Sequence, residues 1–84
     1  MEALASDLLA VQLMQLGQNT EALNLLNQAI QQKPDLSPAW SNRAAIHYHR
    51  DELAVARSDA ETALSLDPTN QQAQSLLSSM ARSR

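Results

Sequence analysis

The sequence predicts an all-α protein built from repeated helical hairpins, and three observations lead to that prediction. The 84-residue chain contains 14 Ala and 14 Leu, which are strong helix formers, but only seven β-branched residues. Apolar residues recur at helical spacing, as at Leu9, Leu13 and Leu16. Pro34 and Pro68 lie 34 residues apart, which indicates an internal repeat of that length.

Small residues repeat with the same period. A shift of 34 residues aligns four pairs of alanines, and a second shift aligns one more: Ala5 with Ala39, Ala10 with Ala44, Ala22 with Ala56, Ala29 with Ala63, and Ala39 with Ala73. Because small side chains let helix axes approach closely, we expect these alanines where helices cross.

The first repeat is predicted to contain two helices. The first covers about residues 3–16 and ends at Gly17, the only glycine, because glycine suits the positive φ of a helix C-cap. The second runs from about Thr20 to Gln32 and stops before Pro34, since the residue preceding a proline disfavours helical backbone.

The second repeat is predicted to begin at Ser37-Pro38, a pair typical of an N-cap followed by proline at the first helical position. This helix is expected to cover residues 38–50. Asp51 is the expected N-cap of the next helix, which covers residues 52–66 and ends before a proline.

A fifth helix is predicted over about residues 71–82. Thr69 and Gln72 have the spacing of a capping box, which satisfies the free N–H groups at a helix start. The five predicted helices thus make two hairpins and one closing helix.

The composition excludes several classes of protein. The chain has no cysteine, so neither a disulfide framework nor a thiolate metal site can form. No apolar stretch approaches the roughly 18 residues of a membrane span. The net charge of −3 and scattered basic residues argue against nucleic-acid binding. Glu2 and Asp7 place acidic groups where a secretory leader is basic, so the cytoplasm is the expected compartment.

No residue pattern indicates an enzyme, a metal or a cofactor. His47 and His49 are two residues apart and therefore lie on different helix faces, so His47 is expected to pack between helices. Nothing pairs a nucleophile with an oriented base, and one glycine cannot form a Gly-rich phosphate loop.

The charged side chains of the second repeat are expected to be solvated. Asp51 and Glu52 suit a helix start, whereas Asp59, Glu61 and Asp67 suit a polar helix face. Three arginines spaced by seven residues span two helices, so no continuous basic stripe is predicted from Arg43, Arg50 and Arg57.

The repeats resemble the tetratricopeptide repeat, a 34-residue helix–turn–helix unit. The second unit carries the family's tryptophan, small residues and unit ending: Trp40, Ala44, Ala56, Ala60, Ala63 and Leu66-Asp67-Pro68-Thr69-Asn70. The first unit is looser, with Ser6 at the tryptophan position, and keeps Ala10, Gly17, Ala22, Leu26, Ala29 and Pro34. Four residues depart from the usual Leu, Tyr, Gly and aromatic residue: Arg43, His47, Asp51 and Ala60.

This resemblance implies one domain over residues 1–84, arranged as a right-handed superhelical stack of antiparallel hairpins. Its parts would be repeat one at 3–36, repeat two at 37–70 and a capping helix at 71–84. Trp40 would lie between one hairpin and its neighbour.

The resemblance also implies a non-catalytic protein-interaction module, in which the first helices of successive hairpins line a concave groove for a partner peptide or helix. Carried onto this chain, the groove residues of the two repeats are Leu4, Asp7, Leu8, Val11, Met14, Gln15, Ser41, Asn42, Ala45, Tyr48 and His49. The capping helix would add Gln72, Ser75 and Ser79.

Some relatives clamp the C-terminal carboxylates of chaperones with Lys, Arg and Asn side chains. The corresponding positions here hold Asp7, Val11, Asn42, Gln72 and Leu76, of which only Asn42 matches. Because carboxylate recognition relies on Arg or Lys, the sequence argues against a chaperone tail as partner.

The first helix is apolar on more than one face, with Leu4, Leu8 and Val11 on one side and Leu9, Leu13 and Leu16 on another. Such a helix is expected to be covered. A partner peptide or helix, a second copy of the chain in a homodimer or stacked array, or a preceding repeat could cover it, or the leucines could simply be exposed. Self-assembly through this helix is therefore the alternative to groove binding.

Overall fold

The computed structural model describes the backbone of residues 3–82 and the side chains of residues 8–82. In this range it contains five α-helices and no strand, which confirms the predicted fold class: α1 (Ala3–Gln15), α2 (Asn19–Gln32), α3 (Ser37–His49), α4 (Leu53–Leu66) and α5 (Gln71–Arg82). Every helix end lies within one residue of its predicted place, the level at which helix boundaries are defined.

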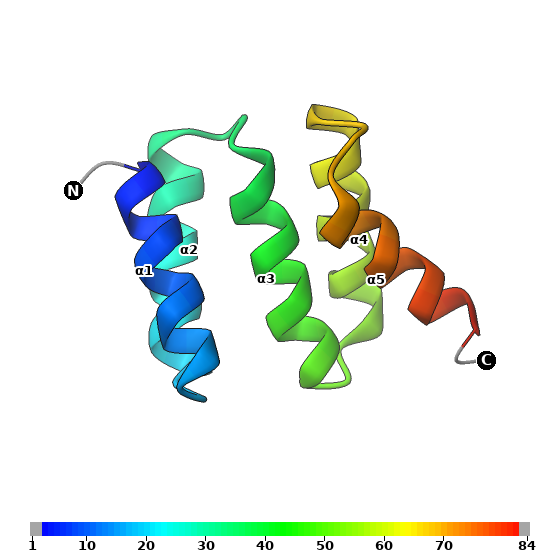
Figure 1. The fold of residues 1–84 in the computed structure, drawn as a ribbon, viewed down its shortest axis with the longest axis horizontal. Coiled ribbons are helices and arrows are strands. Elements are labelled where there is room, and N and C mark those ends of the chain that lie inside the picture. The colour runs from blue at the N-terminus through cyan, green and yellow to red at the C-terminus, as the bar shows by residue number, and fades with distance from the viewer. Residues whose placement is uncertain (1–2, 83–84) are drawn as a thin grey trace.

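The helices form a row of hairpins in two layers (Figure 1). One layer holds α1, α3 and α5, where α1 contacts α3 and α3 contacts α5, and the other holds α2 and α4. Consecutive helices also contact each other, and the stack measures 38 × 26 × 17 Å. The hairpin α1–α2 therefore closes one end of the row and α5 closes the other.

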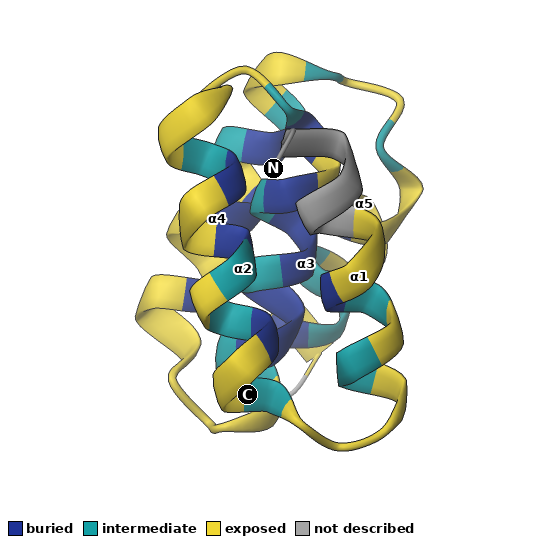
Figure 2. Ribbon diagram, turned by 90° about the vertical axis from the view of Figure 1, so that its left-hand side faces the viewer, coloured by how far each residue is buried: buried dark blue, intermediate teal, exposed yellow. Residues whose placement is uncertain are grey.

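Alanine fills the helix crossings, as the repeat predicts. Eight alanines related by the 34-residue period are fully buried: Ala10 and Ala44, Ala22 and Ala56, Ala29 and Ala63, and Ala39 and Ala73. They divide between two core clusters. In Figure 2 the buried parts of the ribbon, drawn dark blue, lie on the inner sides of the helices. Because α3 contributes to both clusters, it is the central helix of the stack.

Both hairpin turns contain a residue with left-handed backbone at the same place in the repeat. Gly17 has φ 80°, as predicted for a C-cap, and Asp51, one period later in sequence, has φ 63°. Glu52 N–H bonds the His47 carbonyl at 2.9 Å and Asp51 N–H bonds that of Tyr48 at 3.0 Å, which is a Schellman closure of α3. The prediction that Asp51 caps the start of α4 is wrong, because its backbone is used to end α3.

Two further predicted caps are also wrong. Ser37 lies inside α3, and its hydroxyl donates to the Ala63 carbonyl of α4 at 2.8 Å instead of capping its own helix. Thr69 donates its hydroxyl and its N–H to the Asp67 carboxylate, at 2.7 and 3.0 Å. The start of α5 is capped by Asn70, whose side-chain oxygen accepts the Ala73 N–H at 3.0 Å.

Candidate partner-binding surface

The predicted groove residues belong to the first helices of the two hairpins, which lie in one layer and touch. We call the surface formed by these residues of α1 and α3 the first-helix face. The 34-residue period places its members in equivalent pairs, such as Val11 with Ala45 and Gln15 with His49. Leu4 and Asp7, also predicted here, have side chains outside the described residues.

The α1 side of the first-helix face is the more exposed one. Leu8 is 59% exposed and Gln15 is also exposed, while Val11 and Met14 are half-buried. Met14 packs against the first core cluster. Apolar surface of this kind is available for contact with another molecule.

The α3 side is largely covered by α5. Ser41 is only 1% exposed, and its hydroxyl lies 2.9 Å from the Gln72 side-chain oxygen and accepts the Asn70 side-chain amide at 3.1 Å. Asn42 and Ala45 are each 7% exposed. Ser41 therefore ties α3 to the start of α5, and all three residues are largely shielded from solvent.

Tyr48 and His49 form the accessible end of α3. Tyr48 is half-buried against the second core cluster and His49 is exposed. Their rings meet edge-on, with centroids 6.0 Å apart. Of the predicted α5 residues, Gln72 and Ser75 are exposed and Ser79 is half-buried. The accessible part of the first-helix face thus runs from α1 to the C-terminal end of α3.

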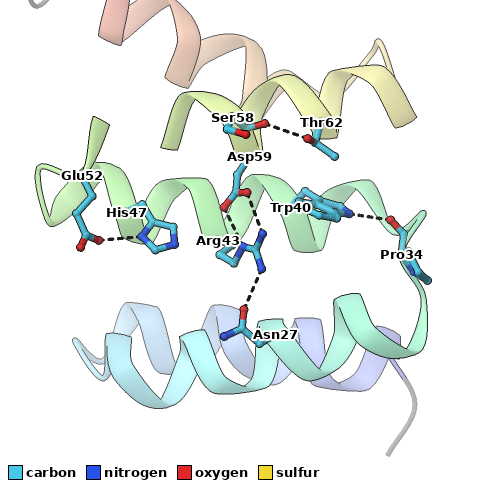
Figure 3. A network of polar contacts seen from close by, with 9 residues as sticks. All are labelled: Asn27, Pro34, Trp40, Arg43, His47, Glu52, Ser58, Asp59 and Thr62. Atoms are coloured by element: carbon cyan, nitrogen blue, oxygen red, sulfur yellow. Dashed lines mark hydrogen bonds and ion pairs between the residues drawn. The ribbon is translucent and has the colours of Figure 1, made fainter. Parts of the chain in front are cut away.

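Sequence reasoning missed a polar network centred on Arg43 (Figure 3). The Arg43 guanidinium donates to both carboxylate oxygens of Asp59 on α4, at 2.8 and 2.9 Å, and to the Asn27 side-chain oxygen of α2 at 3.0 Å. It also lies over the Trp40 ring, 4.8 Å from the centroid, and the Trp40 indole donates to the Pro34 carbonyl at 2.8 Å. One side chain therefore joins the two hairpins.

The expectation that Asp59 lies on a solvated face is wrong. Asp59 is 4% exposed, because it faces α3 and its charge is matched there by Arg43. A signal was present in the sequence, since Arg43 replaces a consensus leucine. Charges at inward positions are retained only when they are paired, so the arginine implied a buried acid.

His47, which the sequence predicts to pack between helices, is half-buried. Its Nδ1 lies 2.8 Å from a carboxylate oxygen of Glu52, across the turn between α3 and α4. Among the described residues no group of three or more His, Cys, Asp and Glu side chains could hold a metal ion. The same part of the chain has no enclosed pocket.

None of the described helices is both long and apolar enough to cross a membrane. Stacked helical hairpins with buried alanines at positions one repeat apart are the arrangement of a helical-repeat protein. Two family models match the chain, a TPR repeat model over residues 12–49 and a tetratricopeptide repeat model over residues 37–70, and together they cover well over half of it. The chain belongs to the tetratricopeptide repeat family. The curated proteins and the solved structures gave no match.

Proposed function

We propose that the chain is a non-catalytic module that binds a protein or peptide partner on the first-helix face. Tetratricopeptide repeats generally mediate protein–protein interaction. The observation that supports this site is one surface across two touching helices on which apolar and aromatic side chains remain accessible, Leu8 above all at 59% exposure. Accessible apolar surface beside polar groups is a common basis of recognition.

An apolar or helical segment fits this surface best. Leu8 and Val11 offer apolar contact, Met14 can adapt its shape, and Tyr48 offers an aromatic edge. Gln15 and His49 supply the polar contacts that would orient the partner. Since Asp7, Gln72 and Leu76 stand where a carboxylate clamp needs cations, a chaperone C-terminal tail is not the proposed partner.

A pull-down with matched variants tests this function. Leu8→Ser and His49→Ala should each reduce the amount of a partner captured by the wild type, because both residues are exposed on the first-helix face. Asn24→Ala and Ser65→Ala, on exposed positions of α2 and α4, should leave capture unchanged. Circular dichroism should show equal helicity for all four variants. Capture that depends on the control positions and not on the first-helix face would contradict the proposal.

The alternative, self-assembly through α1, concerns a different face of that helix. Leu9 and Leu16 are 39% and 73% exposed, so the second apolar stripe of α1 is accessible as well. Groove binding and self-assembly use separate residues and can be tested independently.

A further inference from the structure

The interface between α2 and α3 shows how a helix packs on the first helix of a repeat. Ala39 and Ile46 of α3 are fully buried in the first core cluster. Flanking them, Arg43 reaches Asn27 and Arg50 donates to the Thr20 hydroxyl, each at 3.0 Å. From the first of these contacts to the second, the residue number rises by seven on α3, from Arg43 to Arg50, and falls by seven on α2, from Asn27 to Thr20. The two helices therefore run antiparallel.

The equivalent face of α1 is exposed. One period before Arg43, Ile46 and Arg50 lie Leu9, Gln12 and Leu16. Leu9 and Leu16 are 39% and 73% exposed, and Gln12 is exposed, whereas Ile46 is fully buried. No described helix covers this stripe, although the repeat uses the same face for helix packing in α3.

The register of the α2–α3 contact specifies what would fit the stripe. A helix docking there in the same way runs antiparallel to α1 and presents two apolar residues seven positions apart. A second copy of α1 meets both conditions, because Leu9 would face Leu16 of the second copy and Leu16 would face Leu9 of the second copy. The contact is then self-complementary, as a two-fold interface requires.

The central residue and the charge also favour a second copy. Gln12 lies midway between the leucines and would approach Gln12 of the second copy near the two-fold axis. A side-chain amide both donates and accepts, so two such groups can bond to each other. Leu9, Gln12 and Leu16 are all uncharged, so no like charges face each other within the stripe.

We propose that the Leu9–Gln12–Leu16 stripe of α1 pairs two copies of this chain in an antiparallel, two-fold homodimer. The stripe shares no residue with the first-helix face. Two leucines and one glutamine per copy make a contact well below a standard interface of about 1,600 Å². The dimer is therefore weak and reversible, with a Kd on the order of 100 μM.

Sedimentation from about 10 μM to about 1 mM tests the pairing with charge-swapped variants. Leu9→Glu and Leu16→Lys should each weaken self-association at least about tenfold, because a charge would face a leucine. Mixing the two variants should restore association, since the introduced carboxylate of one copy then faces the introduced ammonium group of the other and the second leucine pair remains. His49→Ala, a change on the first-helix face, should leave the dimer unchanged.

Cysteine crosslinking tests the register, because the chain has no cysteine of its own. Gln12→Cys should form a disulfide-linked dimer under mild oxidation faster than Asn24→Cys, a control on the exposed side of α2. A wild type that stays monomeric at about 1 mM would overturn the proposal. So would association that survives both charge variants, or crosslinking of the Gln12→Cys variant no faster than that of the control.

Discussion

At the residue scale, Arg43 is bonded both within its own hairpin, to Asp59, and across to the first hairpin, to Asn27. It pairs with a buried carboxylate, bonds a second helix and stacks on an aromatic ring. The equivalent places in repeat one, 34 residues earlier, hold Leu9 and Leu25. The same position in the fold is thus filled by an ion pair in one repeat and by two leucines in the other.

This difference between the repeats predicts a double-mutant result. Arg43→Leu leaves the Asp59 carboxylate buried without its cation and should cost about 3 kcal/mol of unfolding free energy. Arg43→Leu combined with Asp59→Leu reproduces the leucine pair of repeat one and should return to within about 1 kcal/mol of the wild type. Urea denaturation measures the unfolding free energies of the wild type, the single variant and the double variant. A double variant no more stable than Arg43→Leu alone would refute this interpretation.

Asp51 carries a backbone conformation that glycine tolerates better. Its φ of 63° costs a non-glycine residue about 1 kcal/mol, so Asp51→Gly should stabilise the fold by about 0.5–1 kcal/mol. The matched control is Gly17→Ala, which should lose a similar amount although a Cβ there meets no atom within 4 Å. Thermal denaturation measures both, and a destabilised Asp51→Gly variant would argue that the Asp51 side chain makes a needed contact.

Asp67 gives the fold a small dependence on acid. The hydroxyl and then the N–H of Thr69 bond its carboxylate and hold its pKa below the usual 3.8. The stabilisation from the lowered pKa of Asp67 is complete above about pH 5. As the pH falls below this value, Asp67 of the unfolded chain takes up a proton before Asp67 of the folded chain does, so the stabilisation is lost. Asp67→Asn should show a smaller fall in thermal midpoint between about pH 5 and pH 2.5. An equal fall in both proteins would contradict this.

At the element scale, α5 is held by polar groups as well as by its apolar side. Ala73 and Met80 are buried in the second core cluster. Asn70 caps the helix and also donates to the hydroxyls of Ser37 and Ser41, at 2.9 and 3.1 Å. The start of α5 is therefore tied directly to α3.

Two substitutions test which residue caps the start of α5: Asn70, as in the structure, or Thr69, as the capping-box spacing predicts. Asn70→Ala should cost about 1–2 kcal/mol, since it removes a helix cap and two bonds to α3. Thr69→Ala should cost less, because Thr69 bonds only the exposed turn before the helix. Chemical denaturation of both variants compares them. A larger loss of unfolding free energy for Thr69→Ala than for Asn70→Ala would indicate that Thr69, not Asn70, caps α5.

Helix positions could be predicted from the sequence because alanine spacing, prolines and the single glycine are local signals. The caps at Asp51 and Thr69 were mispredicted because several polar residues compete at each turn and backbone geometry decides between them. The Arg43–Asp59 pair joins residues 16 positions apart on different helices, so only the packed hairpin reveals it. The groove residues and the repeat boundaries at 3–36, 37–70 and 71–84 stay predictions.

At the scale of the whole molecule, alanine sets both the shape and the stability of the stack. Apart from alanine, the buried apolar residues described are Leu26, Ile46 and Met80. Small side chains at the crossings allow the helices to pack closely, but they bury little apolar area each. We therefore expect the polar links between hairpins, from Arg43 to Asn27 and from Arg50 to Thr20, to be a larger share of the cohesion than in a protein with a leucine-rich core.

Both ends of the row differ in character. The α5 end presents mostly polar side chains to solvent, such as Gln71, Gln74 and Ser78. The α1 end exposes Leu8, Leu9 and Leu16 instead. Terminal repeats of such arrays need a polar outer face for solubility, so the apolar end is where contact with another molecule is most favourable.

Site-specific photo-crosslinking tests the central claim, partner binding on the first-helix face, most directly. A photoreactive residue at His49 or Leu8 should link the chain to the same partner protein in a cell extract. The same residue at Asn24 or Ser65, on the exposed sides of α2 and α4, should give no such product. Crosslinking from these two control positions, with none from Leu8 or His49, would show that the partner binds elsewhere.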